Sequence, residues 1–393
     1  MNIVVIGGGL AGLLAALRLQ RSRHEVVLID DPLPAAGGLL GGFAKFSGAK
    51  FSLPPAGLGL VNVTGSLQIL EETIEEVLAI LRLPLECLHK SSETSLGVAR
   101  QAIVHRQYQS YVLSVQQIDS LIRRLTGELC ISQAILGKAK HLASNGHGQW
   151  RVSVEVKGCL QEYSADRVIV ASGRRDHAIL DAAGATRKVR KGIDIGVRVE
   201  FMNKRGLEVI RQLGADAKIL VGPCRTFCLN FPGDVYRYAF EEIPIPGGVV
   251  AQDNVTRANL GLLYRTADKE QIIRRLKREI RHLKAVSPSL AYDSHSVETV
   301  IDAGLLRGIF PEDAIAALKR FAQELESAEL IDWNVPHLVH FPLLDWHWPT
   351  YALDNSLSTT LDRVYVAGDL SGHARGLLQA AVSGWLCAEE CLR

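Results

Sequence analysis

Four side chains in this sequence are of types that could take part in catalysis or bind a substrate: Lys50, Cys228, His373 and Arg375. The imidazole of His373 could exchange a proton near neutral pH, and the guanidinium of Arg375 could bind an anion. Cys228 is a candidate for lining a substrate pocket. The alternative for His373 and Arg375 is a role that faces phosphate or solvent. Lys50, Cys228 and the pair His373 and Arg375 lie in three separate segments of the sequence, so their role depends on the elements that position them.

Two other groups of reactive side chains give less specific patterns. Cys224 and Cys228 are separated by three residues, whereas the cysteines of familiar disulfide reductases are separated by two or four. Ordinary packing or loop thiols are therefore expected, and a catalytic dithiol is the alternative. His337, His340 and His347 have no companion cysteine or carboxylate at ligand spacing, so we predict no metal site.

A glycine-rich run near the start of the chain lies between a predicted buried strand and an alanine- and leucine-rich helix. Gly7 permits a tight turn, Gly9 lets the backbone approach a pyrophosphate, and Gly12 lets the helix pack close to the strand. The helix directs free N–H groups at the phosphates. A second strand ends at Asp30, whose carboxylate could accept hydrogen bonds from adenosine ribose hydroxyls. The residues predicted to hold a dinucleotide here are Gly7, Gly9, Leu10, Ala11, Gly12, Asp30 and Asp31.

A second strand, turn and helix occupy the C-terminal part of the sequence, with the strand over 363–369 and the helix from about Gly376 to Leu392. Asp369 could accept hydrogen bonds from the ribityl hydroxyls of a flavin dinucleotide. The following helix could point its N-terminal amides at the flavin, where they would stabilise the negative charge gained on reduction. This unit favours FAD over a nicotinamide as the bound cofactor. The further residues predicted to bind it are Gly173, Gly368, Asp369, Gly376, Leu377 and Leu378.

The candidate side chains can now be placed relative to this cofactor. His373 and Arg375 lie in the turn after Asp369 and are expected near the flavin ring, where either could donate a hydrogen bond. Lys50 lies in a Gly- and Pro-rich segment predicted as a long loop over 32–65, and could hydrogen-bond the region of the flavin N5. No second glycine fingerprint is present over 187–341. NAD(P)H is therefore expected, if at all, as a transient electron donor.

The sequence resembles two groups of flavoproteins. The N-terminal fingerprint and the terminal Val366-Ala367-Gly368-Asp369 are similar to those of glutathione-reductase-type FAD proteins. The segments 192–200, 225–228 and 348–350 are similar to those of a widespread group of bacterial and archaeal FAD-dependent dehydrogenases. The resemblance implies tightly bound FAD and a cofactor-binding lobe interrupted by an inserted substrate lobe. Asp30 departs from the pattern, because FAD proteins commonly have glutamate there.

We predict an α/β fold with a Rossmann-like FAD-binding domain, a small β-meander and an inserted mixed α/β substrate domain. The expected domains are the FAD-binding domain over 1–186, which includes the meander, and 346–393, and the substrate or cap domain over 187–345. The strands predicted for the meander cover 135–141, 150–156 and 160–163. Within the substrate domain, Arg198 and Glu200 share one face of a predicted strand. They could form a buried pair or bind substrate.

Composition limits the classes of partner. The 393 residues carry a net charge of +2, which gives no reason to expect nucleic acid or an anionic membrane as the main partner. The seven cysteines are odd in number and scattered, which is typical of reduced thiols.

No apolar stretch reaches the roughly 20 residues that a membrane span needs, and no export signal is recognised. We expect a cytoplasmic protein whose partner is a small-molecule substrate or redox donor.

The function predicted from these features is that of an FAD-dependent oxidoreductase. We expect a dehydrogenase or reductase that transfers a hydride or electrons between FAD and an unidentified small molecule. A flavin monooxygenase or oxidase is one alternative. A non-catalytic protein in which FAD has a structural or regulatory role is another, because the sequence contains no obvious acid–base constellation.

Overall fold

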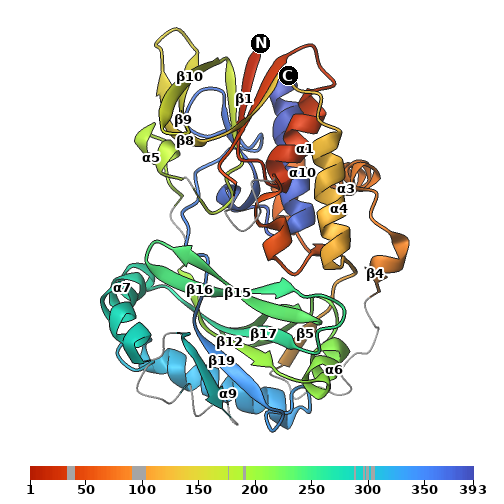
Figure 1. The fold of residues 1–393 in the computed structure, drawn as a ribbon, viewed down its shortest axis with the longest axis vertical. Helices are drawn as coiled ribbons and strands as arrows, with labels where there is room; N and C mark the ends of the chain where they lie inside the picture. The colour runs from red at the N-terminus through yellow and green to blue at the C-terminus, as the bar shows by residue number, and fades with distance from the viewer. Residues whose placement is uncertain are drawn as a thin grey trace.

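A computed structural model of the chain describes residues 1–32, 40–90, 103–175, 177–188, 192–286, 289–294, 297, 301 and 306–393. The described elements form two parts, one above the other in Figure 1. The upper part holds both ends of the chain and a parallel sheet, and the lower part is built on a larger antiparallel sheet. Among the described residues, no helix is both long and apolar enough to cross a membrane.

Five parallel strands form the main sheet of the upper part: β1 (Asn2–Ile6), β2 (Glu25–Asp30), β7 (Gln133–Leu136), β11 (Arg167–Val170) and β20 (Val364–Val366). Their order is β20-β11-β1-β2-β7, and every neighbouring pair is parallel. The central strands are mostly apolar and buried, as expected for a parallel sheet covered on both faces. The edge strand β20 comes from the C-terminal part of the sequence, so distant segments complete this sheet together.

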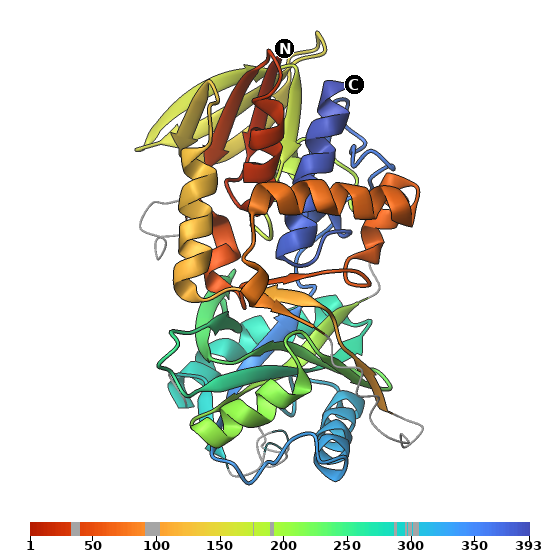
Figure 2. The ribbon, with the colours of Figure 1, turned by 90° about the vertical axis from the view of Figure 1, so that its right-hand side faces the viewer.

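Helices cover one face of the parallel sheet: α1 (Leu10–Leu19), α3 (Leu67–Leu81), α4 (Val115–Gly127) and α10 (Leu377–Leu392). They share a hydrophobic core with β1 and β2. Helices α1 and α10 pack closely because small residues face each other: a Cβ on Gly384 would lie 1.9 Å from the carbonyl oxygen of Ala11. Figure 2 shows α3 lying across α10.

An antiparallel meander and a short helix pack on the other face: β8 (Lys138–Ser144), β9 (Trp150–Val156), β10 (Cys159–Ala165) and α5 (Ala178–Ala182). The predicted first strand over 135–141 is divided in the structure between β7 and β8. The division falls at Gly137, which lies so close to the neighbouring strand that a Cβ would come within 2.8 Å of the Glu155 carbonyl oxygen.

Seven strands form the sheet of the lower part: β5 (Ile103–Arg106), β12 (Ile193–Phe201), β13 (Lys218–Val221), β14 (Cys224–Asn230), β17 (Ala258–Thr266), β18 (Ala291–Ser294) and β19 (His337–Asp345). Their order is β18-β19-β12-β17-β14-β13-β5. The helices of this part are α6 (Lys204–Leu213), α7 (Lys269–Val286) and α9 (Glu312–Ser327). Strand β5 pairs with β13 although it precedes the predicted range 187–345.

The remaining described elements lie between or beside the two sheets. They are β3 (Lys50–Ser52), β4 (Leu88–His89), β6 (Ser110–Val112), the hairpin of β15 (Gly233–Phe240) and β16 (Ile243–Val250), α2 (Val61–Thr64), and the 3₁₀ turns η2 (Gly42–Phe46), η3 (Leu58–Leu60), η4 (Leu85–Cys87) and η5 (Gly368–Ser371). The segment 32–65 was predicted as a loop, but its described part contains η2, β3, η3 and α2, while 33–39 lie outside the described residues. The predicted α/β class, with a meander and a mixed second part, is confirmed.

The contact between α1 and α10 gives a prediction about stability. Because a Cβ on Gly384 would overlap the backbone of Ala11, Gly384→Ala should lower the free energy of unfolding by about 1–3 kcal/mol. Gly127 in the last turn of α4 is a matched control, since no atom lies within 4 Å of its would-be Cβ. Gly127→Ala should leave stability unchanged or raise it slightly. Urea unfolding measures both, and equal effects would contradict the close packing.

Candidate functional site

A cavity of about 660 Å³ is lined by residues of both parts of the molecule. Its walls come from the glycine turn after β1, the ends of β2 and β11, η2, β3, the start of α10, and strands β12, β13 and β14. All the residues predicted from the sequence to bind cofactor or to act in catalysis line this cavity except Gly12 and Leu378. The fold therefore brings nearly all of them to one place.

Gly12 and Leu378 lie outside the cavity for different reasons. A Cβ on Gly12 would come within 1.8 Å of the Gly7 carbonyl oxygen, so this glycine allows α1 to pack against the turn. The side chain of Leu378 is fully buried in the upper core. It follows Leu377, which lines the cavity, but one residue along a helix turns the side chain by about 100°. Leu378 therefore packs inside the fold instead of facing the cavity.

The turn after β1 is held in the shape of a dinucleotide site. Gly7 has φ of 108°, and a Cβ there would lie 2.4 Å from the Ala171 carbonyl oxygen, so only glycine is accommodated. The backbone N–H of Gly8 donates to Asp30 Oδ1 over 2.7 Å, which joins the turn to the end of β2. Asp30 thus supports the glycine turn itself, in addition to lining the cavity.

The space around Gly9 indicates whether this turn suits a phosphate ligand. It lines the cavity, and the nearest protein atom to a Cβ at this position would be the Gly42 Cα at 4.0 Å. Protein packing therefore does not require glycine here, but close approach of a ligand would. Leu10 and Ala11, in the first turn of α1, also line the cavity, and the first amides of a helix have no partner within the helix. The residues present fit a pyrophosphate.

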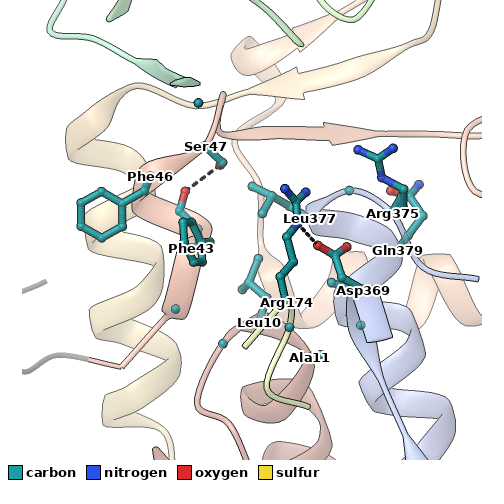
Figure 3. A pocket seen from close by; sticks show the side chains of 18 of the residues that line it. Leu10, Ala11, Phe43, Phe46, Ser47, Arg174, Asp369, Arg375, Leu377 and Gln379 are labelled. Carbon is teal, nitrogen blue, oxygen red and sulfur yellow. Dashed lines mark hydrogen bonds and ion pairs between the residues drawn. The ribbon is translucent and has the colours of Figure 1, made fainter. Parts of the chain in front are cut away.

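The start of α10 is a second helix N-terminus at the same cavity, since Gly376 and Leu377 line it. Before it, Gly368 has φ of 71° and opens the turn η5. Figure 3 shows Asp369 of this turn facing Arg174, whose Nε donates to Asp369 Oδ2 over 2.6 Å. Arg174 also lies over the Trp348 ring at 4.2 Å. Positive charge therefore accumulates on this side of the cavity and is only partly balanced by Asp369.

Arg375 and its neighbour Arg225 share one buried carboxylate. Both donate to Asp345 Oδ2, and Asp345 is fully buried at the end of β19. Burial alone would raise the pKa of Asp345, but Arg375, Arg225 and Arg174 hold this pKa well below its usual range. Arg375 is therefore anchored by an ion pair and lies over the Trp346 ring at 4.7 Å.

His373 and Arg375 occupy different surroundings despite their closeness in sequence. His373 is half-buried, and its Nδ1 lies 3.0 Å from the Gly59 carbonyl oxygen. Both residues line the cavity, as does Gly173, where a Cβ would meet no atom within 4 Å. Asp31, at the other end of the cavity, is ion-paired with Arg175 over 2.9 Å.

The two cysteines of β14 point to different sides. Cys224 is packed in the lower core, where burial raises the pKa of its thiol to about 12. Cys228 follows a β-bulge after Phe227 and has φ of 43°. The extra residue turns Cys228 to the cavity, whereas simple alternation would place it on the core side with Cys224. The alternative of a catalytic dithiol finds no support in this arrangement.

Lys50 on β3 lies next to the same bulge. Its Nζ donates to the Leu229 carbonyl oxygen. Burial lowers the pKa of Lys50, and the nearby Arg198 lowers it further, while Asp216 opposes both effects. Lys50 is thus a cavity-lining amine in a basic environment.

Several cavity residues were not singled out in the sequence. Arg174 and Arg225 line it, as do the rings of Phe43 and Phe46 on η2, which Figure 3 shows on the side opposite Arg375. These two rings pack against the β15–β16 hairpin through aromatic contacts with Tyr238 and Tyr236. The only available signal for Arg174 was its position directly after Gly173, and nothing in the sequence linked Arg225 to its distant carboxylates.

The three histidines discussed as metal ligands have other surroundings. His340 Nε2 lies 2.8 Å from Glu200 Oε2, His337 Nδ1 lies 2.7 Å from the Val335 carbonyl oxygen, and His347 packs among aromatic rings. Among the described residues, no group of three His, Cys, Asp or Glu side chains is arranged to hold a metal ion.

Comparisons with known proteins identify the family. The family model described as "Pyridine nucleotide-disulphide oxidoreductase" matches residues 1–219, which include the glycine turn, β2 and β11. The chain belongs to this family. No curated protein matches the chain. The family is one of FAD-dependent oxidoreductases, so this chain is an oxidoreductase and the predicted cofactor, FAD, is confirmed at the level of the family.

Solved structures of low similarity were also found. A flavoprotein/dehydrogenase from Cytophaga hutchinsonii matches with 12% identity and a TM-score of 0.46, over 100% of this chain and 79% of that one. CtdE in complex with FAD and substrate 4 matches with 17% identity and a TM-score of 0.40, over 98% and 78%. CmlS, a flavin-dependent halogenase, matches with 13% identity and a TM-score of 0.44, over 98% and 56%.

The open space at Gly9 predicts a specific effect on cofactor binding. Gly9→Ala should fold normally, because its Cβ meets no protein atom closer than 4.0 Å, but should weaken FAD binding at least tenfold by obstructing the pyrophosphate. Flavin content after purification and FAD titration of the apoprotein measure this effect. Gly127→Ala, on α4 and away from the cavity, should retain FAD fully. Unchanged affinity in Gly9→Ala would contradict the placement of the pyrophosphate.

The buried carboxylate of Asp345 predicts a pH-dependent effect on stability. Its pKa is lowered in the folded protein, so its ion pairs stabilise the fold above the ordinary carboxyl pKa and this contribution is lost as the pH falls below that value. Asp345→Asn should lower the free energy of unfolding by roughly 3 kcal/mol at pH 7. The difference should shrink as the pH falls below about 4.

Urea unfolding between pH 3 and pH 8 measures this difference. Asp362→Asn is the control, because the Asp362 side chain is 76% exposed, and it should change the free energy of unfolding by less than about 0.5 kcal/mol. A difference for Asp345→Asn that stays constant down to pH 3 would show that the ion pairs are not its cause.

Proposed function

We propose that this chain is a dehydrogenase or reductase of its family, which transfers a hydride or electrons between FAD and a small molecule held against the lower sheet, in the cavity that both parts line. One observation carries the proposal: a single cavity runs from the glycine turn of the upper part to the basic side chains of β12 and β14 in the lower part. A cofactor in the upper part of this cavity and a substrate in the lower part would be in contact.

The chain's own residues divide between the two ligands. The turn at Gly7 and Gly9 and the first amides of α1 would hold the pyrophosphate. Asp30 and Asp369 both line the cavity, and their carboxylates would accept hydrogen bonds from ribose and ribityl hydroxyls. The backbone amides at the N-terminus of α10, which begins at Gly376 and Leu377, would stabilise negative charge on the flavin. Bound FAD supplies the two-electron redox chemistry.

The side chains facing the substrate side supply charge and exclude water. Lys50 and Arg375 are basic side chains at the cavity wall, and Arg375 is fixed there by its ion pair with Asp345. His373 is the candidate for moving a proton, since its imidazole is accessible. The bulge in β14 turns Cys228 toward the cavity. There its thiol would contact the substrate without forming a disulfide.

The finer classification follows the sequence resemblance. The similarity of both nucleotide-facing units to glutathione-reductase-type proteins supports a cofactor domain formed by 1–186 and 346–393, with a substrate domain over 187–345. The segments shared with FAD-dependent dehydrogenases support a role without oxygen as the substrate. Since no second glycine fingerprint is present over 187–341, NAD(P)H would act as a transient donor at the flavin.

Anaerobic reduction tests this function. We expect the holoprotein to lose its absorbance near 450 nm when mixed with NADH, NADPH or a reduced small-molecule substrate, because electrons pass to bound FAD. After reduction, slow reaction with oxygen on admission of air is expected of a dehydrogenase. Rapid oxygen consumption would identify an oxidase or monooxygenase instead. A flavin that no small donor reduces, with no loss of cellular function on substitution of His373, would indicate a non-catalytic role.

A further inference from the structure

Arg198 is a buried guanidinium whose charge is not balanced by any acid in direct contact. It lies on β12, lines the cavity and has 0% of its surface exposed. Its Nε donates to the Pro246 carbonyl oxygen over 2.9 Å, and its Nη1 donates to Asn259 Oδ1 over 2.7 Å and to the Cys228 carbonyl oxygen over 3.2 Å. All three acceptors are neutral. Nη2 is buried and has no hydrogen-bond partner among the residues that the structure describes.

Other arginines of the cavity differ from Arg198 in this respect. Arg174 is paired with Asp369, Arg225 with Asp194 and Asp345, and Arg375 with Asp345. Glu200, two residues from Arg198 on the same face of β12, is paired with His340 and Arg257. A buried charge without a counterion is costly, and so is a buried donor without an acceptor. Both costs are removed if an anion enters the cavity.

We propose that Arg198 anchors the carboxylate of an organic acid substrate, which its unpartnered Nη2 binds in the lower part of the cavity. The proposal rests on the proposed function, because it names the substrate class for the same site. It assigns to Arg198 the role of a specificity-determining residue.

The surroundings of Arg198 favour a carboxylate attached to an organic group. Lys50 lines the same cavity, and its charge lies near enough to Arg198 for the two to interact, so a second oxygen of the ligand could be bound there. Asp216 interacts favourably with Lys50. No such acid is in direct contact with the guanidinium of Arg198 among the described residues. Phe227 and Leu343 add apolar surface to the cavity wall. A planar carboxylate presents acceptors that match guanidinium donors, and the apolar wall suits its carbon chain.

Several contacts hold the guanidinium of Arg198 in one position. A Cβ on Gly248 would come within 2.5 Å of Arg198 Nη1, and the bulge that exposes Cys228 also presents its carbonyl oxygen to that nitrogen. These contacts fix two of the three nitrogens, and Nη2 is the nitrogen to which the proposal assigns the ligand. The side chain is thus held in place before any substrate binds.

Titration of the unmodified holoprotein with matched acids and amides is the first test. Acetate and benzoate should perturb the flavin absorbance saturably and raise the melting temperature, because an anion relieves the buried charge. Acetamide, benzamide and chloride at equal ionic strength should do neither. The same melting measurements on the apoprotein separate the two proposals: a response to carboxylates without FAD supports the Arg198 site even if the redox function fails.

Substitution of Arg198 is the second test. Arg198→Lys keeps the positive charge but loses the planar nitrogens, and it should raise the dissociation constants of acetate and benzoate at least tenfold while FAD content is retained. Arg278→Lys is the control, because the Arg278 side chain is 70% exposed on α7, and it should bind as the unmodified protein does.

Two results would overturn the proposal. Equal responses to the acids and their amides would show that charge is not recognised. Unchanged carboxylate affinity in a folded Arg198→Lys protein would place the anion elsewhere. If Arg198→Lys does not fold, the comparison of acids with amides on the unmodified protein decides the outcome.

Discussion

Positive charge held away from water is the constraint on which the rest of this structure depends. The N-termini of α1 and α10 and several guanidinium groups line one cavity. Each charge in such a place requires a nearby negative group. Asp345 and Asp194, both almost fully buried, supply it for the arginines of the lower sheet, and Asp369 supplies it for Arg174. Positive charge that remains after this pairing, as at Arg198, would favour an anionic ligand in the cavity.

The two sheets contribute to this cavity in different ways. The parallel sheet ends in turns whose glycines allow a ligand to approach the backbone, while the antiparallel sheet presents long charged side chains from alternate positions of its strands. Along β12, Ile193, Ile195, Val197 and Val199 face the lower core and Asp194, Arg198 and Glu200 face the other side. The upper sheet therefore offers backbone groups to a ligand in the cavity, and the lower sheet offers charged side chains.

The sequence predicted the parts of the site that depend on local pattern. The glycine turn at Gly7 and Gly9, the acid at Asp30 and the second unit around Asp369 are short-range signals, and the structure brings them to one cavity. The alternation along β12 likewise placed Arg198 and Glu200 on one face. Whether Arg198 and Glu200 form an ion pair could not be predicted from the sequence. Glu200 pairs instead with His340 and Arg257, which lie far along the chain.

Other features depend on contacts between distant segments and left no local signal. The bulge that turns Cys228 to the cavity arises from its pairing with β17. The addition of β5 to the lower sheet depends on its pairing with β13, about 110 residues later. The sequence indicated the helix that contains Leu378 but not the rotation of this helix about its own axis, so it did not show that the Leu378 side chain packs in the core. Backbone pairing and helix rotation are set by the tertiary structure.

The packing of α10 against α1 has a consequence for how the protein matures in the cell. The ribosome makes residues 364–392 long after the glycine turn has emerged, yet these residues supply an edge strand and one wall of the nucleotide cradle. A nascent chain that has folded its first strands still lacks the wall of the cavity that the start of α10 supplies. Completion of the nucleotide cradle therefore waits for the synthesis of these late residues.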